Sequence, residues 1–352
     1  MSVTPNGEPQ TAVTPSPPGV VALLGVLMSL VSALALAGET RERIIIVGSS
    51  TVYPFSAAVA EHFARSGPFQ APMLSATSTG EGFRLFCAGA AAETPDISNA
   101  SRPISEAERA HCAQNGVKRI AAIRIGYDSL VVVNSVATAS LNLTLSQLWR
   151  AAASKVPIAG RLAANPYRLW SDIDPGLPHE PIYLIGPAPG HGTRDAFVEL
   201  VMEPSCRAAL ADLPVASAAD ESCATVRKDG HWSDVDNMEL VLGKLASNHA
   251  AIGILTYSYL DQFSHRIHAG TIDGVAASSV SISSGAYPMS RPLFMYVKQD
   301  HLKSTTGLAD FAAEFLSFCA AGAHGYLADQ GLVPLPRAEL LAARAAVARL
   351  QR

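Results

Sequence analysis

Short apolar runs alternate with amphipathic segments along most of the chain, and this alternation constrains the fold more than any other feature. The runs with strand character are residues 44–47, 73–77, 120–125, 129–133, 182–185, 252–256 and 293–297. The segments with helical spacing are 52–65, 82–88, 105–115, 145–152, 193–202, 234–247, 308–319 and 337–351. Strands separated by helices predict an α/β fold with largely parallel sheets.

Polar residues mark where two of these helices should begin. The segment Ser105-Glu106-Ala107-Glu108 has the serine and glutamate spacing of a capping box. Asp234 and Asp236 stand where an N-cap carboxylate would favour the positive end of a helix.

The length of 352 residues favours two domains over one. The middle of the chain differs in texture, because it carries all three tryptophans and a proline-rich stretch at 165–181. We therefore expect a second domain, residues 129–286, inserted into a first domain made of 39–128 and 287–352. Hydrophobic residues make up 49% of the chain and charged residues 16%, which is typical of a globular protein. The net charge of −4, without a Lys/Arg run, disfavours a nucleic-acid partner.

Residues 1–38 have the character of a targeting segment. An uncharged run, VVALLGVLMSLVSALALA, covers 20–37 and ends in the small-x-small pattern Ala35-Leu36-Ala37. The run is also just long enough to span a bilayer. A cleaved signal peptide, an uncleaved N-terminal anchor and a buried helix remain as alternatives. The first two would export the rest of the chain to the periplasm.

The five cysteines fit an oxidising compartment. Cys87 lies near Cys112 in sequence and Cys206 near Cys223, so two local disulfides are plausible, and Cys319 is left over. The alternative is that all five are buried thiols. The sequence contains no CxxC or HExxH motif, and we expect neither a bound metal nor a cofactor.

Four loops share hydroxyl and glycine residues next to a predicted strand or helix. They are GSST at 48–51, SATSTGEGF at 75–83, DISNASRPIS at 96–105 and GPAPGHGTRDAF at 186–197. A helix that follows a strand presents free backbone N–H groups and a positive dipole end, which together attract an anion. Any one such loop is more simply a helix cap. Four of them, three from the first predicted domain and one from the second, indicate an anion site between the domains.

Competing motifs receive little support. No G-x-x-x-x-G-K-[ST] or G-x-S-x-G pattern occurs, which excludes a P-loop and a hydrolase nucleophile elbow. Ser50, His191 and Asp96 could be drawn as a catalytic triad, but nothing beyond residue type supports one.

Seven segments, in order along the chain, resemble the periplasmic phosphate-binding proteins of ABC transporters (the PstS-like family). They are VGSSTVYPFSAAVAEHF, TSTGEGFRLFC, DISNASRPISEAERAHCAQNGV, IGYDSLVVV, GHGTRDAF, AIGILTYSYL and YPMSRPLFMYVK, spread over about residues 44–336. The resemblance implies a class II periplasmic-binding-protein fold, in which two α/β lobes joined by crossover strands enclose the ligand.

The resemblance also implies which residues bind phosphate through backbone N–H groups, hydroxyls and a guanidinium. Matched motif by motif, they are Ser50, Thr51, Ser78, Thr79, Gly80, Ser101, Arg102, Gly190, His191, Gly192, Thr193 and Arg194.

Two departures from the family pattern concern charge. Many members have an Asp directly after the serine of the third loop, where this chain has Arg102, and an Arg shortly before the Gly-x-Gly-Thr turn, where this chain has GPAP. The positive charge is therefore expected at Arg102 or Arg194. Asp96 is a candidate replacement for the missing proton acceptor, with a buried cap as its alternative role.

The resulting prediction is a monomeric, non-enzymatic receptor that captures inorganic phosphate and delivers it to the permease and ATPase subunits of an ABC importer. A receptor for another oxyanion and an exported phosphatase-like enzyme are the alternatives.

Overall fold

A single nine-stranded sheet organises the part of the chain that the computed structural model describes, residues 40–213, 221–235 and 237–351. The strands are β1 (Ile45–Ser49), β2 (Met73–Thr77), β3 (Ile97–Ala100), β4 (Ile120–Ser135), β7 (Leu184–Pro187), β8 (Trp232–Val235), β9 (Ile252–Thr256), β10 (Ile267–Ala269) and β11 (Ser290–Lys298). A separate hairpin consists of β5 (Lys155–Ile158) and β6 (Arg161–Ala164).

Helices and helical turns fill the connections between strands. They are α2 (Tyr53–Ser66), α3 (Thr79–Phe86), α4 (Glu106–Gln114), α5 (Leu145–Ala152), α6 (Trp170–Ile173), α7 (Gly192–Phe197), η1 (Val198–Met202), α8 (Glu203–Ala211), η3 (Glu221–Ala224), α9 (Met238–Ser247), α10 (Tyr257–Gln262), α11 (Ser279–Ser283), η4 (Gln299–His301), α12 (Leu308–Phe315), α13 (Phe318–Ala321), α14 (Tyr326–Asp329) and α15 (Arg337–Ala348). The predicted α/β class is confirmed.

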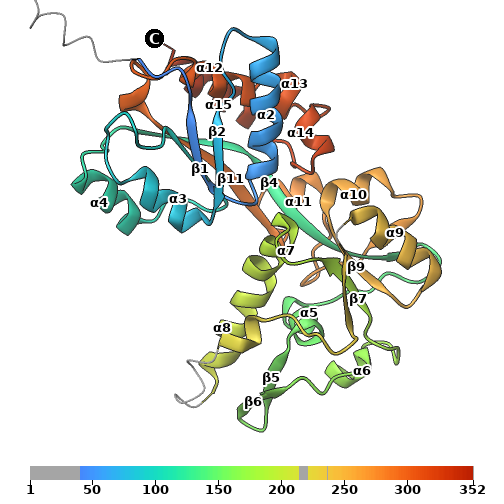
Figure 1. Ribbon diagram of the computed structural model, residues 1–352. Helices are drawn as coiled ribbons and strands as arrows, with labels where there is room; N and C mark the ends of the chain where they lie inside the picture. Colours follow the sequence, from blue (N-terminus) through green and yellow to red (C-terminus); the bar gives the residue numbers. More distant parts are fainter. Residues whose placement is uncertain (1–39, 214–220, 236, 352) are drawn as a thin grey trace, which may run out of the picture. The chain divides into compact units, whose positions relative to one another are not determined.

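The sheet has two parallel halves joined by antiparallel strands. Its order is β2-β1-β3-β11-β4-β9-β7-β8, with β10 paired to β4. β1 pairs in parallel with β2 and β3, and β7 pairs in parallel with β8 and β9. The long strand β4 pairs first with β11 and then with β9, so β4 and β11 are the crossover strands between two lobes (Figure 1).

Helices pack on both lobes of this sheet. In the first lobe α3 packs on β1 and β3, and α2 packs on β2 and α12. In the second lobe α9 packs on β7, β8 and β9. Phe63 and Phe311 are buried between α2 and α12, with ring centroids 5.5 Å apart in an edge-to-face arrangement. The proposed boundaries, 39–128 with 287–352 and 129–286, remain a prediction, and the first of them falls inside β4.

Several predicted elements differ from the structure. Residues 120–125 and 129–133 form the single strand β4, because Gly126 and Asp128 interrupt the apolar pattern while the pairing with β11 continues past them with one register shift. The predicted helix at 234–247 begins later: Asp234 lies in strand β8, and Asn237 caps α9 by accepting a hydrogen bond from the N–H of Glu239. The capping box of Ser105 and Glu108 is confirmed.

Strand β3 lies inside the third hydroxyl loop, where the sequence predicts no strand. Its four residues, Ile-Ser-Asn-Ala, are too few and too polar to show a period, yet all of them are buried between neighbouring strands. The predicted helices at 193–202 and 308–319 are each divided into two helical segments.

Both predicted disulfides are present, Cys87–Cys112 and Cys206–Cys223, and Cys319 is an exposed free thiol. The apolar run at 20–37 lies outside the described residues. Among the residues that were described, no helix combines the length and the apolar character that crossing a membrane requires.

Candidate functional site

The first and fourth hydroxyl loops lie against each other, although their contacting residues Ser50 and Asp195 are 145 positions apart in the sequence. A Cβ added to Gly192 would lie 3.3 Å from the carbonyl oxygen of Ser50 and 3.3 Å from the Cα of Thr51. The Ser50 hydroxyl donates a hydrogen bond of 2.7 Å to Asp195 Oδ2 on α7. The two loops therefore connect the first lobe to the second.

Glycine 48 allows the first loop to turn toward this contact. Its φ of +116° belongs to the region that favours glycine. A Cβ at this position would lie 2.2 Å from the carbonyl oxygen of Asn99 on the neighbouring strand β3. A side chain here would push β1 and β3 apart, and with them the loops that follow both strands.

The second and third loops meet through their hydroxyl groups. Thr79 Oγ1 and Ser101 Oγ lie 3.0 Å apart, and the N–H of Ser101 donates to Thr79 Oγ1 over 3.1 Å. Ser78 is the N-cap of α3, since its hydroxyl accepts from the N–H of Glu81. The helix-cap interpretation of Ser78 is therefore correct, and its exposed position still allows a contact with a ligand.

Two adjoining hollows, of about 460 and 530 Å³, open beside these loops. They share Ser78, Thr79, Glu199 and Glu203 and so form one cleft between the lobes. Of the predicted ligand residues, the cleft is lined by Ser50, Ser78, Thr79, Gly80, Ser101 and Arg102. Arg291, Asp195 and Glu199 also line it, and none of these three is among the ligand residues predicted from the sequence.

Arg291 supplies the buried positive charge of the cleft. It faces Asp128 directly across the β4–β11 ladder, and its Nε and Nη2 lie 3.3 and 3.2 Å from Asp128 Oδ2. Its Nη2 also donates to the Thr51 hydroxyl over 2.8 Å. Its Nη1 forms an ion pair with Glu199 on η1. We refer to Asp128, Glu199 and Arg291 as the Arg291 cluster.

Burial raises the pKa of Asp128, and the positive charge of Arg291 only partly offsets this effect. The side chains of Asp128 and Arg291 are exposed by only 7% and 8%. Arg291 lines the cleft, and Asp128 holds it in place from outside the residues that line the two hollows. Glu199 is different, because its side chain is 44% exposed.

The two arginines that the resemblance implied are engaged elsewhere. Arg102 makes two hydrogen bonds, of 2.7 and 2.8 Å, to the carboxylate of Glu108. Burial acts to raise the pKa of Glu108, but the bonds from Arg102 and from Ser105 outweigh it and lower that pKa from 4.5 to about 2. Arg102 lies at the rim of the cleft.

Arg194 turns away from the cleft. It binds Asp234 Oδ1 at 3.0 Å and the carbonyl of Pro187 at 2.9 Å, and its guanidinium lies 4.9 Å from the centre of the Trp232 ring. Of the remaining fourth-loop candidates, Gly190, His191 and Thr193 stand at the start of α7, outside the residues that line the two hollows.

Asp96 is not brought to the cleft. It precedes β3, whereas Ser101 follows it, so about 16 Å of extended chain separates the two residues. Its Oδ2 accepts from the N–H of Ile45 over 2.7 Å, and its Oδ1 contacts His301 Nδ1 at 2.7 Å. Oδ1 also binds Arg41 and the Thr305 hydroxyl. These contacts satisfy both carboxylate oxygens of Asp96, so Asp96 is not the acceptor for the proton of a bound hydrogen phosphate. Asp128 remains a candidate for that role.

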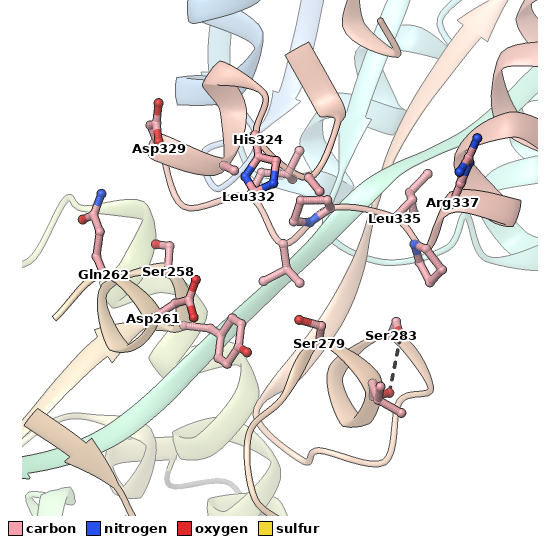
Figure 2. Close-up of a pocket in the computed structure, with 17 residues that line it drawn as sticks. Ser258, Asp261, Gln262, Ser279, Ser283, His324, Asp329, Leu332, Leu335 and Arg337 are labelled. Carbon is pink, nitrogen blue, oxygen red and sulfur yellow. Dashed lines mark hydrogen bonds between the residues drawn. The ribbon is translucent and has the colours of Figure 1, made fainter. Parts of the chain in front are cut away.

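Another pocket, of about 570 Å³, lies elsewhere in the molecule (Figure 2). It is formed by α10, α11 and the segment before α15, and Asp261, Ser279, His324 and Arg337 are among its lining residues. None of the predicted ligand residues lines it. Within the described residues, no group of three or more His, Cys, Asp or Glu side chains could hold a metal ion.

A family model described as a PBP superfamily domain matches residues 35–321. The chain belongs to this superfamily. Its fold is that of the periplasmic phosphate-binding proteins. A solved structure of a possible phosphate binding protein from Planctomyces limnophilus superposes with a TM-score of 0.72 and 26% identity, covering 89% of this chain and all of that one.

Two curated relatives match over most of their length. Protein SphX of Synechococcus elongatus is 28% identical over 306 residues, which cover 85% of this chain and 80% of that protein. The phosphate-binding protein PstS of Staphylococcus saprophyticus is 25% identical over 303 residues, which cover 82% and 79%.

A signal for the missed residues is present in the sequence. Asp128 and Arg291 are single charges inside otherwise apolar strands, GYDSLVVV and SRPLFMYV. A charge in such a run is costly unless it is paired, so each one indicates a partner on a neighbouring strand. Glu199 is likewise the one charge in the apolar run AFVELVM, but on a helical segment a charged residue can face solvent, so it indicates no particular partner.

Proposed function

We propose that this chain is an extracytoplasmic receptor that captures inorganic phosphate in the cleft between its lobes. The observation that carries the proposal is the convergence of the donors Ser50, Thr79, Ser101 and Arg291 on one cleft. The similarity to the phosphate-binding protein PstS of Staphylococcus saprophyticus, and to the possible phosphate binding protein of Planctomyces limnophilus, supports phosphate as the ligand.

The proposed ligand set differs from the set predicted from the sequence in which arginine carries the positive charge at the anion. Hydroxyls of Ser50, Ser78, Thr79 and Ser101 and the backbone of Gly80 would donate to the phosphate oxygens. Arg291 would supply the principal positive charge, since it is buried beside the cleft, whereas Arg102 is 46% exposed and Arg194 lines neither hollow. The Thr51 hydroxyl would position Arg291 through their hydrogen bond. Gly192 would hold the loops together, and Gly190, His191 and Thr193 would shape the turn before α7.

Selectivity for phosphate over sulfate would rest on Asp128. Hydrogen phosphate carries a proton that it can donate to a carboxylate, whereas sulfate can only accept hydrogen bonds. Asp128 itself does not line the hollows, so this contact would require the ligand to reach past the Arg291 guanidinium. Sulfate beside the charged Asp128 carboxylate would then leave a repulsive, unpaired contact in a buried place. Asp128 would thus take over the role of the acid that many family members carry after the third-loop serine.

The proposed partners are the permease and ATPase subunits of an ABC importer, with the receptor acting as a monomer outside the cytoplasm. Residues 1–38 would export it as a signal peptide or hold it as an anchor. Ligand contacts from both lobes would favour a closed state, which the permease would recognise.

Calorimetric titration of the phosphate-stripped protein with phosphate, arsenate, sulfate and molybdate tests this proposal. We expect phosphate to bind about a hundredfold or more tightly than sulfate, because sulfate leaves Asp128 unpaired. Asp128→Asn should bring the two affinities closer together. Equal competition by sulfate against phosphate in the wild-type protein would instead indicate a receptor for another oxyanion.

A further inference from the structure

Two carboxylates of the second lobe occupy the donor groups that an oxyanion would need. Asp195 Oδ2 accepts the hydroxyl hydrogen of Ser50 over 2.7 Å. Glu199 Oε2 forms the ion pair with Arg291 and accepts from the Ser101 hydroxyl over 3.4 Å. Four residues separate Asp195 and Glu199, so both lie on the side of this helical segment that faces the cleft.

A carboxylate oxygen and a phosphate oxygen are acceptors of the same kind. A hydroxyl has one hydrogen to donate, so the Ser50 hydroxyl cannot serve Asp195 and a phosphate oxygen equally, and the Ser101 hydroxyl cannot serve Glu199 and a phosphate oxygen equally. Arg291 Nη1 carries a second N–H hydrogen, but an anion placed there would lie beside the negative charge of Glu199 and be repelled by it. The contacts with Asp195 and Glu199 and the contacts with a bound anion therefore exclude one another, at least in part.

Of the carboxylates around Arg291, Glu199 is the one that can leave. Its side chain is 44% exposed, while that of Asp128 is 7% exposed. A rotation about the side-chain bonds of Glu199 would bring its charge into water at little desolvation cost. The Asp128 carboxylate cannot rotate into water in this way, because it is buried and Arg291 lies directly opposite it across the ladder.

We propose that Glu199, assisted by Asp195, is a tethered competitor that fills the anion site when no ligand is bound and closes the two lobes on each other. The inference rests on the proposed function, because it concerns the same cleft. Phosphate must displace Glu199 from Arg291 and Ser101, so its apparent affinity is lowered by the fraction of molecules in which the carboxylate occupies the site. Glu199 thereby sets the affinity of the receptor, while Asp128 sets its selectivity.

Glu199 and the bound anion compete because both are negatively charged. The proton of hydrogen phosphate plays no part in this competition, so phosphate and sulfate should respond alike. The wild-type protein and the variants Glu199→Gln and Glu199→Ala would be stripped of phosphate and titrated with phosphate and with sulfate at one ionic strength. If the carboxylate holds the site in about nine-tenths of ligand-free molecules, both variants should bind phosphate about tenfold more tightly. The affinity for sulfate should rise by the same factor.

Glu339→Gln is the matched control. Glu339 pairs with Arg124 at 3.0 Å and is 39% exposed, close to the exposure of Glu199, but it does not line the cleft. Its replacement should leave both affinities unchanged.

Unchanged or weaker phosphate binding by both Glu199 variants would overturn the inference. A selective loss of phosphate binding would show that Glu199 accepts the ligand's proton instead, which also overturns it.

Small-angle scattering of the phosphate-free proteins separates this inference from the proposed function. Wild type should have a smaller radius of gyration than Glu199→Ala without any ligand, and equal radii would count against the tether. If no oxyanion binds the wild-type protein or the variants, the proposed function fails and the competitor role fails with it. If wild type binds phosphate and the variants match it, only the competitor role fails.

Discussion

The two ends of strand β3 carry two charged clusters with opposite properties. Before the strand lies the Asp96 cluster of Arg41, Asp96, His301 and Thr305, in which the Asp96 side chain is fully buried and both its oxygens are satisfied. Past the other end lies the Arg291 cluster, which borders an open cleft and includes the 44% exposed Glu199.

The difference shows what turns a buried charge into a binding site. In the Asp96 cluster both oxygens of the central carboxylate are bound, and Asp96 itself is fully buried, so the carboxylate cannot be exchanged for another anion. The cluster ties Arg41 and η4 to the start of β3. The Arg291 cluster has one partner that solvent can reach, so that partner can be exchanged. Burial alone does not distinguish the two clusters, because Asp128 is nearly as buried as Asp96.

The largest effect is expected from Asp96→Ala. The substitution removes the carboxylate that binds both Arg41 and His301 in a buried place. We therefore expect the free energy of unfolding to fall by about 3–5 kcal/mol. The measurement is urea denaturation followed by circular dichroism. Phosphate affinity of the folded variant should match that of wild type. A tenfold loss of affinity in folded protein would place Asp96 in the binding site after all.

Arg291→Lys should lower phosphate affinity by about 2–3 kcal/mol, because lysine keeps the charge beside Asp128 but cannot bind two acceptors in fixed geometry. Calorimetric titration measures the change. Arg102→Lys and Arg194→Lys are the controls, and each should cost much less. A larger loss for Arg102→Lys would move the principal positive charge to the rim of the cleft.

Ser101→Ala should lower phosphate affinity by about 1 kcal/mol, the contribution of one hydroxyl hydrogen bond. The matched control is Ser105→Ala, which removes a helix cap four residues later and should affect stability but not affinity. Titration and urea denaturation of both variants distinguish the two roles. Equal affinities for Ser101→Ala and wild type would remove Ser101 from the ligand set.

An effect of similar size, on stability rather than on affinity, is expected from Glu108→Gln, which tests whether the Glu108 carboxylate is paired with Arg102. Because the folded-state pKa of Glu108 is lowered from 4.5 to about 2, its charge stabilises the fold above pH 4.5, and this stabilisation is lost as pH falls toward 2. The variant should be less stable by about 1 kcal/mol at pH 7. In urea denaturation, the difference from wild type should shrink steadily between pH 5 and pH 3. A difference independent of pH would contradict the charge pairing with Arg102.

Much of the fold could be predicted because long periodic segments show their pattern locally. The helices α2, α4 and α5 and the strands β2 and β9 lie where the sequence predicts them. The short strands β3, β8 and β10 could not be predicted, because three or four residues are too few to display a period, and these strands are held by neighbours distant in the chain.

The sequence by itself determined the α/β class and the hydroxyl loops and indicated the two cysteine pairs, because each depends on residues that are close together in the chain. Tertiary structure alone decided which charges meet in the cleft. Arg291 reaches Asp128 across a strand pair that spans 163 residues, and Glu199 reaches Arg291 from the other lobe. Asp96, Arg102 and Arg194 carry suitable charges in suitable loops, but each is already bound by carboxylates or donors that only the folded chain brings to it. Ionic pairing depends on distance in space and on exclusion of water, and neither property is local in the sequence.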